Sequence, residues 1–234
     1  LILMKNHCRH CNATLTKDII DLGNQPPSNN YLFPEQLSEK EVTYPLKVFI
    51  CENCGLVQLP ESLKPEELFT NKYAYFSSTS SSWCKHASNF VENSIKELSL
   101  NEKSNIIEIA SNDGYLLQYF KKNNIPCLGI EPTSDTAKES KRKGIKTLEK
   151  FFTTQLAKEL DKADLVIANN VAAHVPDIND FIKGIQLVLK KNGVASIEFP
   201  HILNLLKGNQ FDTIYHEHYS YFSLKTFRQI SRHA

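Results

Sequence analysis

The sequence has almost no excess of charge of either sign. Its 234 residues include 27 lysines and arginines against 26 aspartates and glutamates, which gives a formal net charge of +1. A protein whose main task is to coat nucleic acid or an acidic membrane carries a large basic excess, so the charge balance argues against both functions. Hydrophobic residues make up 41% and charged residues 23%, as in ordinary globular proteins, and global disorder is not expected.

Long hydrophobic runs are also missing. The longest ones, such as residues 164–168, are far shorter than the ~20 residues that a membrane-spanning helix needs. The segment from Leu1 to Met4 is too short for a signal peptide and has no cleavage pattern. We therefore expect no membrane association and a cytoplasmic location.

Cysteines are few, and four of the six lie in two CxxC pairs. Disulfides are rare in a reducing compartment, so paired CxxC elements there indicate metal ligands. Two such pairs can supply four thiolates to one tetrahedral Zn²⁺, which leaves no open position for catalysis and predicts a structural site. A redox pair is the alternative, but neither pair begins a helix after a strand, where a thiolate would be stabilised. The predicted zinc ligands are Cys8, Cys11, Cys51 and Cys54.

The two cysteine pairs are separated by 39 residues, so an insertion must fold between them. His7 and His10 flank the first pair, but four cysteines already fill the coordination shell. Residues 1–65 hold six basic and seven acidic residues, whereas a zinc ribbon that binds nucleic acid should be basic. We expect residues 1–65 to form a zinc-binding domain without a nucleic-acid partner.

The next segment, residues 66–100, is predicted to be a helical connector. Apolar residues recur at helical spacing between Ser82 and Leu98. Just before this helix, residues 73–82 combine many serines with three aromatic residues, which a flexible linker would not need.

From residue 105 onward the pattern alternates between strands and helices. The expected strands are 105–110, 127–131, 164–168 and 194–199, and the expected helices are 115–122, 135–143 and 178–189. Repeated strand–helix–strand units predict an α/β fold with a parallel sheet that has helices on both faces.

The glycine pattern GxGxxG of dinucleotide-binding turns is absent. The first strand–helix turn runs from Glu108 to Gly114, with Ala110 and Asn112 where glycines might stand and no third glycine. Asparagine tolerates left-handed backbone better than most residues. The second strand ends in Glu131 and Pro132, and an acid at that place can hold a ribose diol. These features favour an adenosine ligand without a pyrophosphate, although a tight turn beside a surface glutamate would look the same.

Four motifs occur in order along the chain: the two cysteine pairs, EIASNDG at residues 108–114, NNVAAHVPD at 169–177 and FDTIYHEHYSYFS at 211–223. Together they resemble the sugar C-methyltransferase family, over residues 8 to about 232. The last motif is the most diagnostic one, since generic class I methyltransferases lack it. The resemblance implies S-adenosylmethionine-dependent enzymes that have a zinc-binding domain followed by a Rossmann-like class I methyltransferase domain. They methylate a carbon of nucleotide-linked keto-deoxy sugars, on routes to unusual sugars of antibiotics and surface polysaccharides.

The resemblance also implies roles for individual residues. His218 matches the proposed general base, and the unperturbed imidazole pKa of ~6.5 suits a base at neutral pH. Tyr215 and Glu217 line the sugar site. His174 reaches the sugar side of the sheet. The other implied residues are Glu108, Ala110, Asn112, Gly114, Glu131, Pro132, Asn169 and Asn170 for the cofactor, and Tyr73 and Tyr75 for the substrate. His201 is expected to border the substrate site because of its position just after the expected strand 194–199.

Members of this family continue into a further C-terminal domain, whereas this chain stops at Ala234 within an expected helix. A seven-stranded methyltransferase sheet would then lack its last two strands. The expected organisation is a zinc-binding domain at 1–65, the connector at 66–100, the cofactor domain at 101–208 and the active-site segment at 209–234. A monomer is expected.

Two other functions remain open from the sequence. The first is an O- or N-methyltransferase that acts on another small molecule, but the Tyr-x-Glu-His motif favours carbon, because methylation at carbon needs a base and control of an enolate. The second is a non-catalytic zinc-containing remnant. The presence of Glu108, Gly114, Glu131 and His218 argues against such decay.

Overall fold

The computed structural model describes residues 7–69 and 75–233. The chain divides into two compact units, and each gathers segments that are distant in sequence. The cysteine unit comprises Leu1–Leu68, Ala172–Ile182 and Phe199–Ala234, and the parallel-sheet unit comprises Phe69–Val171 and Lys183–Glu198. The four-segment organisation expected from the sequence stays a prediction. No helix in the described part of the chain combines the length and the apolar character needed to cross a bilayer.

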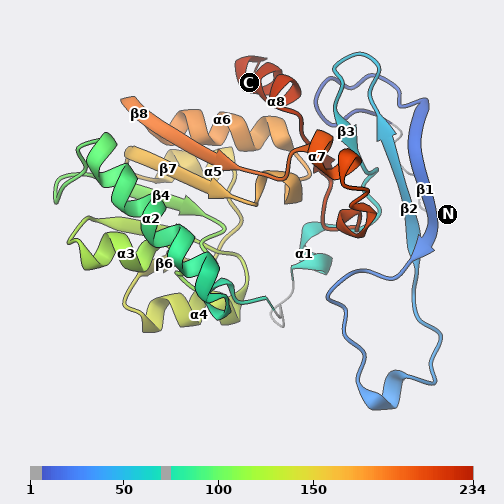
Figure 1. Ribbon diagram of the computed structural model, residues 1–234, viewed down its shortest axis with the longest axis horizontal. Helices are drawn as coiled ribbons and strands as arrows, with labels where there is room; N and C mark the ends of the chain where they lie inside the picture. Colours follow the sequence, from blue (N-terminus) through green and yellow to red (C-terminus); the bar gives the residue numbers. More distant parts are fainter. Residues whose placement is uncertain (1–6, 70–74, 234) are drawn as a thin grey trace. The chain divides into compact units, whose positions relative to one another are not determined.

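The parallel-sheet unit is built on five parallel strands in the order β6-β5-β4-β7-β8 (Figure 1). The strands are β4 (Ile106–Ile109), β5 (Cys127–Ile130), β6 (Lys146–Leu148), β7 (Ala163–Asn169) and β8 (Leu189–Glu198). The helices are α2 (Ser81–Glu97), α3 (Leu117–Lys122), α4 (Ser134–Arg142), α5 (Thr154–Glu159) and α6 (Ile178–Val188), whose residues up to Ile182 belong to the cysteine unit, and η2 (Ser77–Thr79) is a short 3₁₀ helix. The predicted parallel α/β sheet is confirmed.

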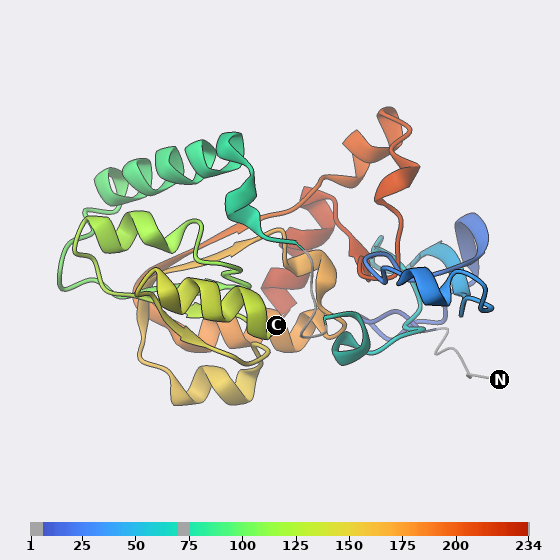
Figure 2. The ribbon, with the colours of Figure 1, turned by 90° about the horizontal axis from the view of Figure 1, so that it is seen from below.

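Burial explains why the central strands have no polar face. All four residues of β4 are buried, because α2 and α3 cover one face of the sheet and α5 and α6 the other (Figure 2). Strands covered on both sides are nearly continuous apolar runs rather than alternating ones. The core between the sheet and its helices includes Val91, Ile106, Leu116, Phe120 and Leu165.

Two elements of this unit were not expected from the sequence. Strand β6 has only three residues, and α5 has only six, so neither gives a periodic signal long enough to recognise. β8 also begins at Leu189 rather than at 194, and its first half is largely exposed, so its sequence lacks the apolar character of a central strand.

The strand order fixes where a ligand can bind in this sheet. The chain adds β5 and then β6 on one side of β4, and later adds β7 and then β8 on the other side. Open α/β sheets bind ligands at the carboxyl ends of the strands where the winding reverses, here between β4 and β7. The residues that follow β4, β5 and β7 are therefore the ones best placed to form a site.

The cysteine unit holds a second, antiparallel sheet in the order β1-β2-β3-β9 (Figure 1). Its strands are β1 (Lys17–Gln25), β2 (Tyr44–Ile50), β3 (Val57–Gln58) and β9 (Ser220–Tyr221). The helices are α1 (Pro65–Leu68), α7 (Ile202–Lys207) and α8 (Leu224–His233), with 3₁₀ helices η1 (Pro34–Gln36), η3 (Ala172–His174) and η4 (Phe211–Thr213). Val57 pairs with Tyr221, and Gln58 pairs with Ser220. The segment next to the Tyr-x-Glu-His motif thus forms a strand of the sheet that follows the second cysteine pair.

Gly114, at the end of the turn after β4, gives the first prediction. Its φ is +75°, and an added Cβ would lie 2.9 Å from Ser140 Oγ and closer still to Ile145 Cδ1. Gly114→Ala should therefore combine the ~1–2 kcal/mol of a left-handed non-glycine residue with a further ~1–3 kcal/mol of overpacking. Gly23 has a φ of +71° and nothing within 4 Å of an added Cβ, so Gly23→Ala isolates the backbone term. Urea unfolding should give a larger loss for Gly114→Ala; equal losses would contradict the packing argument.

Candidate active site

The four predicted zinc ligands lie together in the cysteine unit. The sulfur atoms of Cys8, Cys11, Cys51 and Cys54 all lie within 4.8 Å of one another, and two of the pairs, Cys8–Cys54 and Cys11–Cys51, are 3.5 Å apart. Tetrahedral zinc with Zn–S bonds of ~2.3 Å places its sulfur ligands about 3.8 Å apart. The donor set and its spacing therefore fit one Zn²⁺.

Each cysteine pair forms the same kind of tight turn. Gly55 follows the second pair with a φ of +74° and donates its amide to the Cys51 carbonyl at 2.8 Å. Asn12 follows the first pair with a φ of +60° and donates its amide to the Cys8 carbonyl at 2.9 Å. The Gln58 side chain also donates to Cys8 Sγ at 3.2 Å. The hydrogen bond between Cys8 and Cys54 lowers the pKa of the Cys8 thiol and raises that of Cys54, and the Gln58 side chain adds to the lowering at Cys8.

The first cysteine pair also holds the segment that carries His174. Arg9, whose guanidinium lies over the Tyr219 ring, donates to the carbonyls of Pro176, at 2.7 Å, and Leu59. His10 Nδ1 lies 2.7 Å from Asn179 Oδ1, and the Asn179 side chain donates to the His10 carbonyl at 2.9 Å. His10 thus contacts α6 and is not in the cysteine cluster.

The turn after β4 contains the left-handed backbone that its sequence suggested. Ala110, Asn112 and Gly114 have φ values of +57°, +50° and +75°. Glu131, directly after β5, is buried, and its carboxylate accepts the amides of Asn112 and Thr133, each at 2.9 Å. The carboxylate that could hold a ribose is therefore joined to the turn itself. Pro132 follows it in the chain.

Buried carboxyl groups gather around this turn. Among the described residues, Glu108 Oε2 and Asp113 Oδ1 are buried atoms without a hydrogen-bond partner. Burial and the nearby acids Glu131 and Asp113 raise the pKa of Glu108 well above its usual value. Burial also raises the pKa of Glu131, against the hydrogen bonds that it accepts. So many acidic groups disfavour a pyrophosphate and suit a ligand that carries positive charge.

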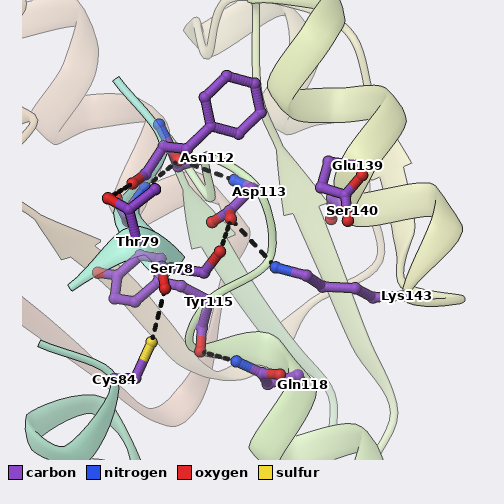
Figure 3. Close-up of polar contacts among 12 residues, drawn as sticks. Ser78, Thr79, Cys84, Asn112, Asp113, Tyr115, Gln118, Glu139, Ser140 and Lys143 are labelled. Atoms are coloured by element: carbon purple, nitrogen blue, oxygen red, sulfur yellow. Dashed lines mark hydrogen bonds and ion pairs between the residues drawn. The ribbon is translucent and has the colours of Figure 1, made fainter. Parts of the chain in front are cut away.

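The serine-rich aromatic segment is fastened to the same turn (Figure 3). The Asn112 side chain accepts the Ser77 amide at 2.9 Å and donates to the Tyr75 carbonyl at 3.0 Å. Asp113 accepts from Ser78 Oγ and from Lys143 Nζ, the latter at 3.1 Å. Ser77, Ser78, Asp113 and Lys143 were not expected at the site, and the serine density of residues 73–82 was a signal for the two serines alone. Tyr75 is brought beside the turn with its side chain half exposed, whereas Tyr73 lies outside the described residues.

Further polar groups stand where β7 and β8 end. Asn170, with a φ of +52°, donates its amide to the Glu198 carbonyl at 2.8 Å and its side chain to Glu198 Oε1 at 3.1 Å. Asn169 hydrogen-bonds the hydroxyl of buried Tyr115. The Trp83 ring stacks on Tyr115 with centroids 6.0 Å apart. Glu198 and Tyr115 belong to this edge of the sheet, although no sequence motif marked them.

The histidines of the cysteine unit form a compact cluster. Residues 215–218 make a turn, closed by the His218 amide and the Tyr215 carbonyl at 3.0 Å, which breaks the alternation of an extended strand. The turn stacks the Tyr215 ring on the His218 ring at 4.0 Å, and the His174 ring lies 4.7 Å from His218. Tyr221 meets His218 edge-on at 5.9 Å.

Hydrogen bonds fix the orientation of His218. Nδ1 lies 2.8 Å from the Thr213 carbonyl, which can only accept, so Nδ1 carries the hydrogen. Nε2 then presents a lone pair, 2.9 Å from the Tyr215 hydroxyl. In the same way, His174 Nδ1 donates to the Glu217 carbonyl at 3.0 Å.

Burial changes the protonation expected for these histidines. It lowers the pKa of His218 to about 4, against the hydrogen bond to Thr213 that raises it. Burial and the nearby His218 lower the pKa of His174, and burial lowers that of His216. The ordinary value of ~6.5, used in the sequence analysis, therefore does not hold for His218, which is neutral throughout the physiological range.

His201 takes a different place. It precedes α7, with Nδ1 3.2 Å from the Leu203 amide nitrogen and Nε2 3.1 Å from that of Leu224. The imidazole is thus engaged with backbone amides of its own unit, and its expected position at the border of the substrate site stays a prediction.

Comparison with known families decides the identity of the larger domain. Residues 83–234 match a family described as "Methyltransferase domain", and residues 8–69 match one described as "Putative zinc binding domain". The chain belongs to the methyltransferase domain family.

Relatives agree with this assignment. The chain is 32% identical over 223 residues to the C-methyltransferase NovU of Streptomyces niveus, a match that covers 94% of this chain and 53% of NovU. The chain therefore spans about half the length of this curated relative.

Solved structures share the fold. A SAM-dependent methyltransferase from Archaeoglobus fulgidus superposes with a TM-score of 0.52 at 16% identity, over 62% of this chain and 67% of its own. The PH0226 protein from Pyrococcus horikoshii gives a TM-score of 0.55 at 14% identity, over 73% and 89%. The fold is therefore that of the Rossmann-like class I methyltransferases, preceded by a cysteine-cluster domain.

The residues present fit the cofactor of this fold, S-adenosylmethionine. Glu131 offers carboxylate oxygens to ribose hydroxyls at the end of the second strand of the unit. A cation next to the unpartnered oxygens of Glu108 and Asp113 would favour the ionised form of Glu108, whose pKa burial raises. Ala110, Asn112 and Gly114 supply the left-handed backbone by which the turn after β4 would approach the ligand.

The cysteine cluster predicts one zinc ion per chain. Cys51→Ser should remove the metal and destabilise the cysteine unit, because metal binding supplies folding energy to a segment with a small core. Cys84→Ser is the control, since Cys84 lies in the other unit with its thiol 3.7 Å from the Ser78 carbonyl. Elemental analysis and chelator-dependent unfolding measure both effects. Protein purified without chelator and found free of zinc would contradict the site.

The buried histidines predict a loss of stability in acid. The unfolded chain binds a proton at His218 near pH 6.5, whereas the folded chain does so only near pH 4, so stability falls as pH drops below 6.5. Between pH 7 and pH 5 the contribution of His218 is about 2 kcal/mol. Urea unfolding of His218→Gln should therefore show a shallower pH dependence than the parent. The parental slope in His218→Gln would contradict the buried neutral imidazole.

Proposed function

We propose that this protein is an S-adenosylmethionine-dependent C-methyltransferase that acts on a nucleotide-linked keto-deoxy sugar, with His218 as the general base. The observation that carries the proposal is the orientation of His218, buried and neutral with Nε2 directed toward a tyrosine hydroxyl. The similarity to NovU supports methylation at carbon. The sugar class rests on the resemblance of the motif at 211–223.

The chemistry requires a neutral base of this kind. A C–H bond next to a ketone is weakly acidic, and methylation of that carbon begins with removal of its proton. Nε2 of His218 takes the proton, and the electron pair of the C–H bond passes into the enolate. The Nδ1–H bond to the Thr213 carbonyl remains in place and stabilises the imidazolium that forms.

Other groups of the cluster have distinct tasks. The Tyr215 hydroxyl donates to the unprotonated Nε2 in the free protein, so it must turn away before Nε2 accepts the carbon proton. It would then be able to donate to the developing enolate oxygen. His174, held by the Glu217 carbonyl, is a second neutral imidazole beside the base. S-adenosylmethionine, when bound, supplies a methyl group on a sulfonium, so the enolate carbon gains the methyl and the sulfur keeps the electron pair of the broken bond.

An enzyme that methylates oxygen or nitrogen would share the cofactor half, and a non-catalytic remnant would share the fold. Exchange of the α-hydrogen of the sugar with D₂O separates these functions, because only carbon chemistry forms an enolate. The parent protein with S-adenosylhomocysteine should exchange this hydrogen for a nucleoside diphosphate keto-deoxy sugar. A protein that methylates another small molecule and exchanges none of these sugars would contradict the proposal.

His218→Ala should lose both exchange and methylation by ~10²–10⁴-fold, as expected for the loss of a general base. It should keep its affinity for S-adenosylhomocysteine in calorimetry, because proton removal and cofactor binding use different residues. Glu131→Ala is the matched control: it should weaken cofactor binding by ~1–3 kcal/mol and retain exchange at sugar saturation. Parental exchange in His218→Ala would place the base elsewhere, with His174 or His216 the next candidates.

A further inference from the structure

The carboxylate of Glu217 is held by residues outside every motif of the sequence. Glu217 is 1% exposed, and its Oε1 accepts the Ser28 hydroxyl at 3.0 Å and the Asn29 side-chain amide at 2.8 Å. Both donors lie in the insertion between the two cysteine pairs, nearly the whole length of the chain away in sequence. The insertion supplies none of the four cysteines, yet two of its side chains contact the active-site segment.

Two donors on one oxygen define the orientation of a carboxylate. A single hydrogen bond leaves the group free to turn about its last bond, whereas two donors from different side chains fix the carboxylate plane and thus the direction of the second oxygen. The hydroxyl of Ser28 and the amide of Asn29 therefore restrict the rotation of the Glu217 carboxylate.

The backbone of the insertion is restricted around Ser28 and Asn29. Asn29 has a φ of +59°, a conformation that asparagine tolerates better than most residues. Two prolines, Pro26 and Pro27, restrict the backbone just before Ser28. The insertion is also anchored at both ends, since Gln25 of β1 pairs with Tyr44 of β2. Its donors are thus presented by a constrained loop.

We propose that Ser28 and Asn29 are positioning residues that orient the Glu217 carboxylate toward a sugar hydroxyl, which makes the insertion between the cysteine pairs a part of the substrate site. This inference rests on the proposed function, in which Glu217 lines the sugar site. The zinc-binding domain then contributes to substrate recognition through its insertion as well as to stability.

The test uses variants that change the donors and keep the backbone. Asn29→Asp preserves size and tolerance for left-handed backbone but replaces the donor by a second carboxylate, and Asn29→Gly removes the amide while keeping the backbone free. Each should raise the sugar KM about tenfold, with zinc content and the Kd of S-adenosylhomocysteine unchanged. Ser28→Ala should act in the same direction, and Ser28→Thr, which keeps a hydroxyl, should restore parental values. Asn30→Ala, at an exposed neighbouring position, should leave the KM unchanged.

A double-mutant cycle with Glu217→Ala tests whether these residues act through Glu217. Once the carboxylate is gone, Asn29→Gly should change kcat/KM for the sugar less than twofold further, whereas independent structural effects would multiply. Multiplying effects, or a parental KM in Asn29→Asp, would overturn the inference while leaving the proposed function intact.

The same cycle is measured on the urea midpoint of unfolding, which requires no substrate. Non-additive midpoint shifts support the held carboxylate, and additive shifts overturn the inference even if no sugar is turned over. Parent protein that neither exchanges nor methylates any keto-deoxy sugar would overturn the proposed function and, with it, the assignment of a substrate role to Ser28 and Asn29.

Discussion

The gathering of four cysteine thiols is the constraint on which the cysteine unit depends. It holds residues 8–11 against residues 51–54, next to the end of the β1–β2 pair where Lys17 lies opposite Ile50. From the second pair the chain continues directly into β3, and β3 pairs with β9, the strand that follows His218. From the first pair, Arg9 reaches Pro176, two residues after His174. The cysteine cluster is therefore connected to the segments next to both histidines of the candidate site. A metal ion bound there would affect the proposed reaction only by holding these segments in position.

The parallel-sheet unit meets a different constraint, the burial of acidic groups. Glu131 accepts backbone amides, and Asp113 Oδ2 accepts from Lys143 and Ser78, whereas Glu108 Oε2 and Asp113 Oδ1 are buried atoms that no described residue partners. Burying a carboxyl oxygen in this way lowers stability unless a ligand compensates. A cationic cofactor bound at the turn would offer that compensation.

The sequence predicted secondary-structure elements and the cysteine ligands better than it predicted which distant segments pair in the folded chain. Cysteine spacing predicted the metal cluster, and the apolar runs at β4, β5 and β7 predicted the sheet, because both signals are local. The pairing of β3 with β9 and the contact of Asn29 with Glu217 could not be predicted, since each joins residues more than 150 positions apart through one or two hydrogen bonds. Short elements such as β6 were missed because three residues carry no period. The low pKa of His218 could not be foreseen either, because burial is a property of the fold.

In the proposed mechanism, burial of His218 favours the reaction, although it lowers the stability of the fold in acid. An imidazole with a pKa of about 4 is a weak base toward water, yet it is neutral at physiological pH and can accept a proton. Because His218 is buried, the imidazolium and the enolate formed in the proposed step would attract each other more strongly than in solution. The low pKa of His218 in the free protein therefore underestimates the basicity of its imidazole during the proposed proton transfer, because the enolate is a counter-ion that the free protein lacks. In acid, protonation of His218 without an enolate leaves a buried charge beside His174, so the histidine cluster loses stability as the pH falls.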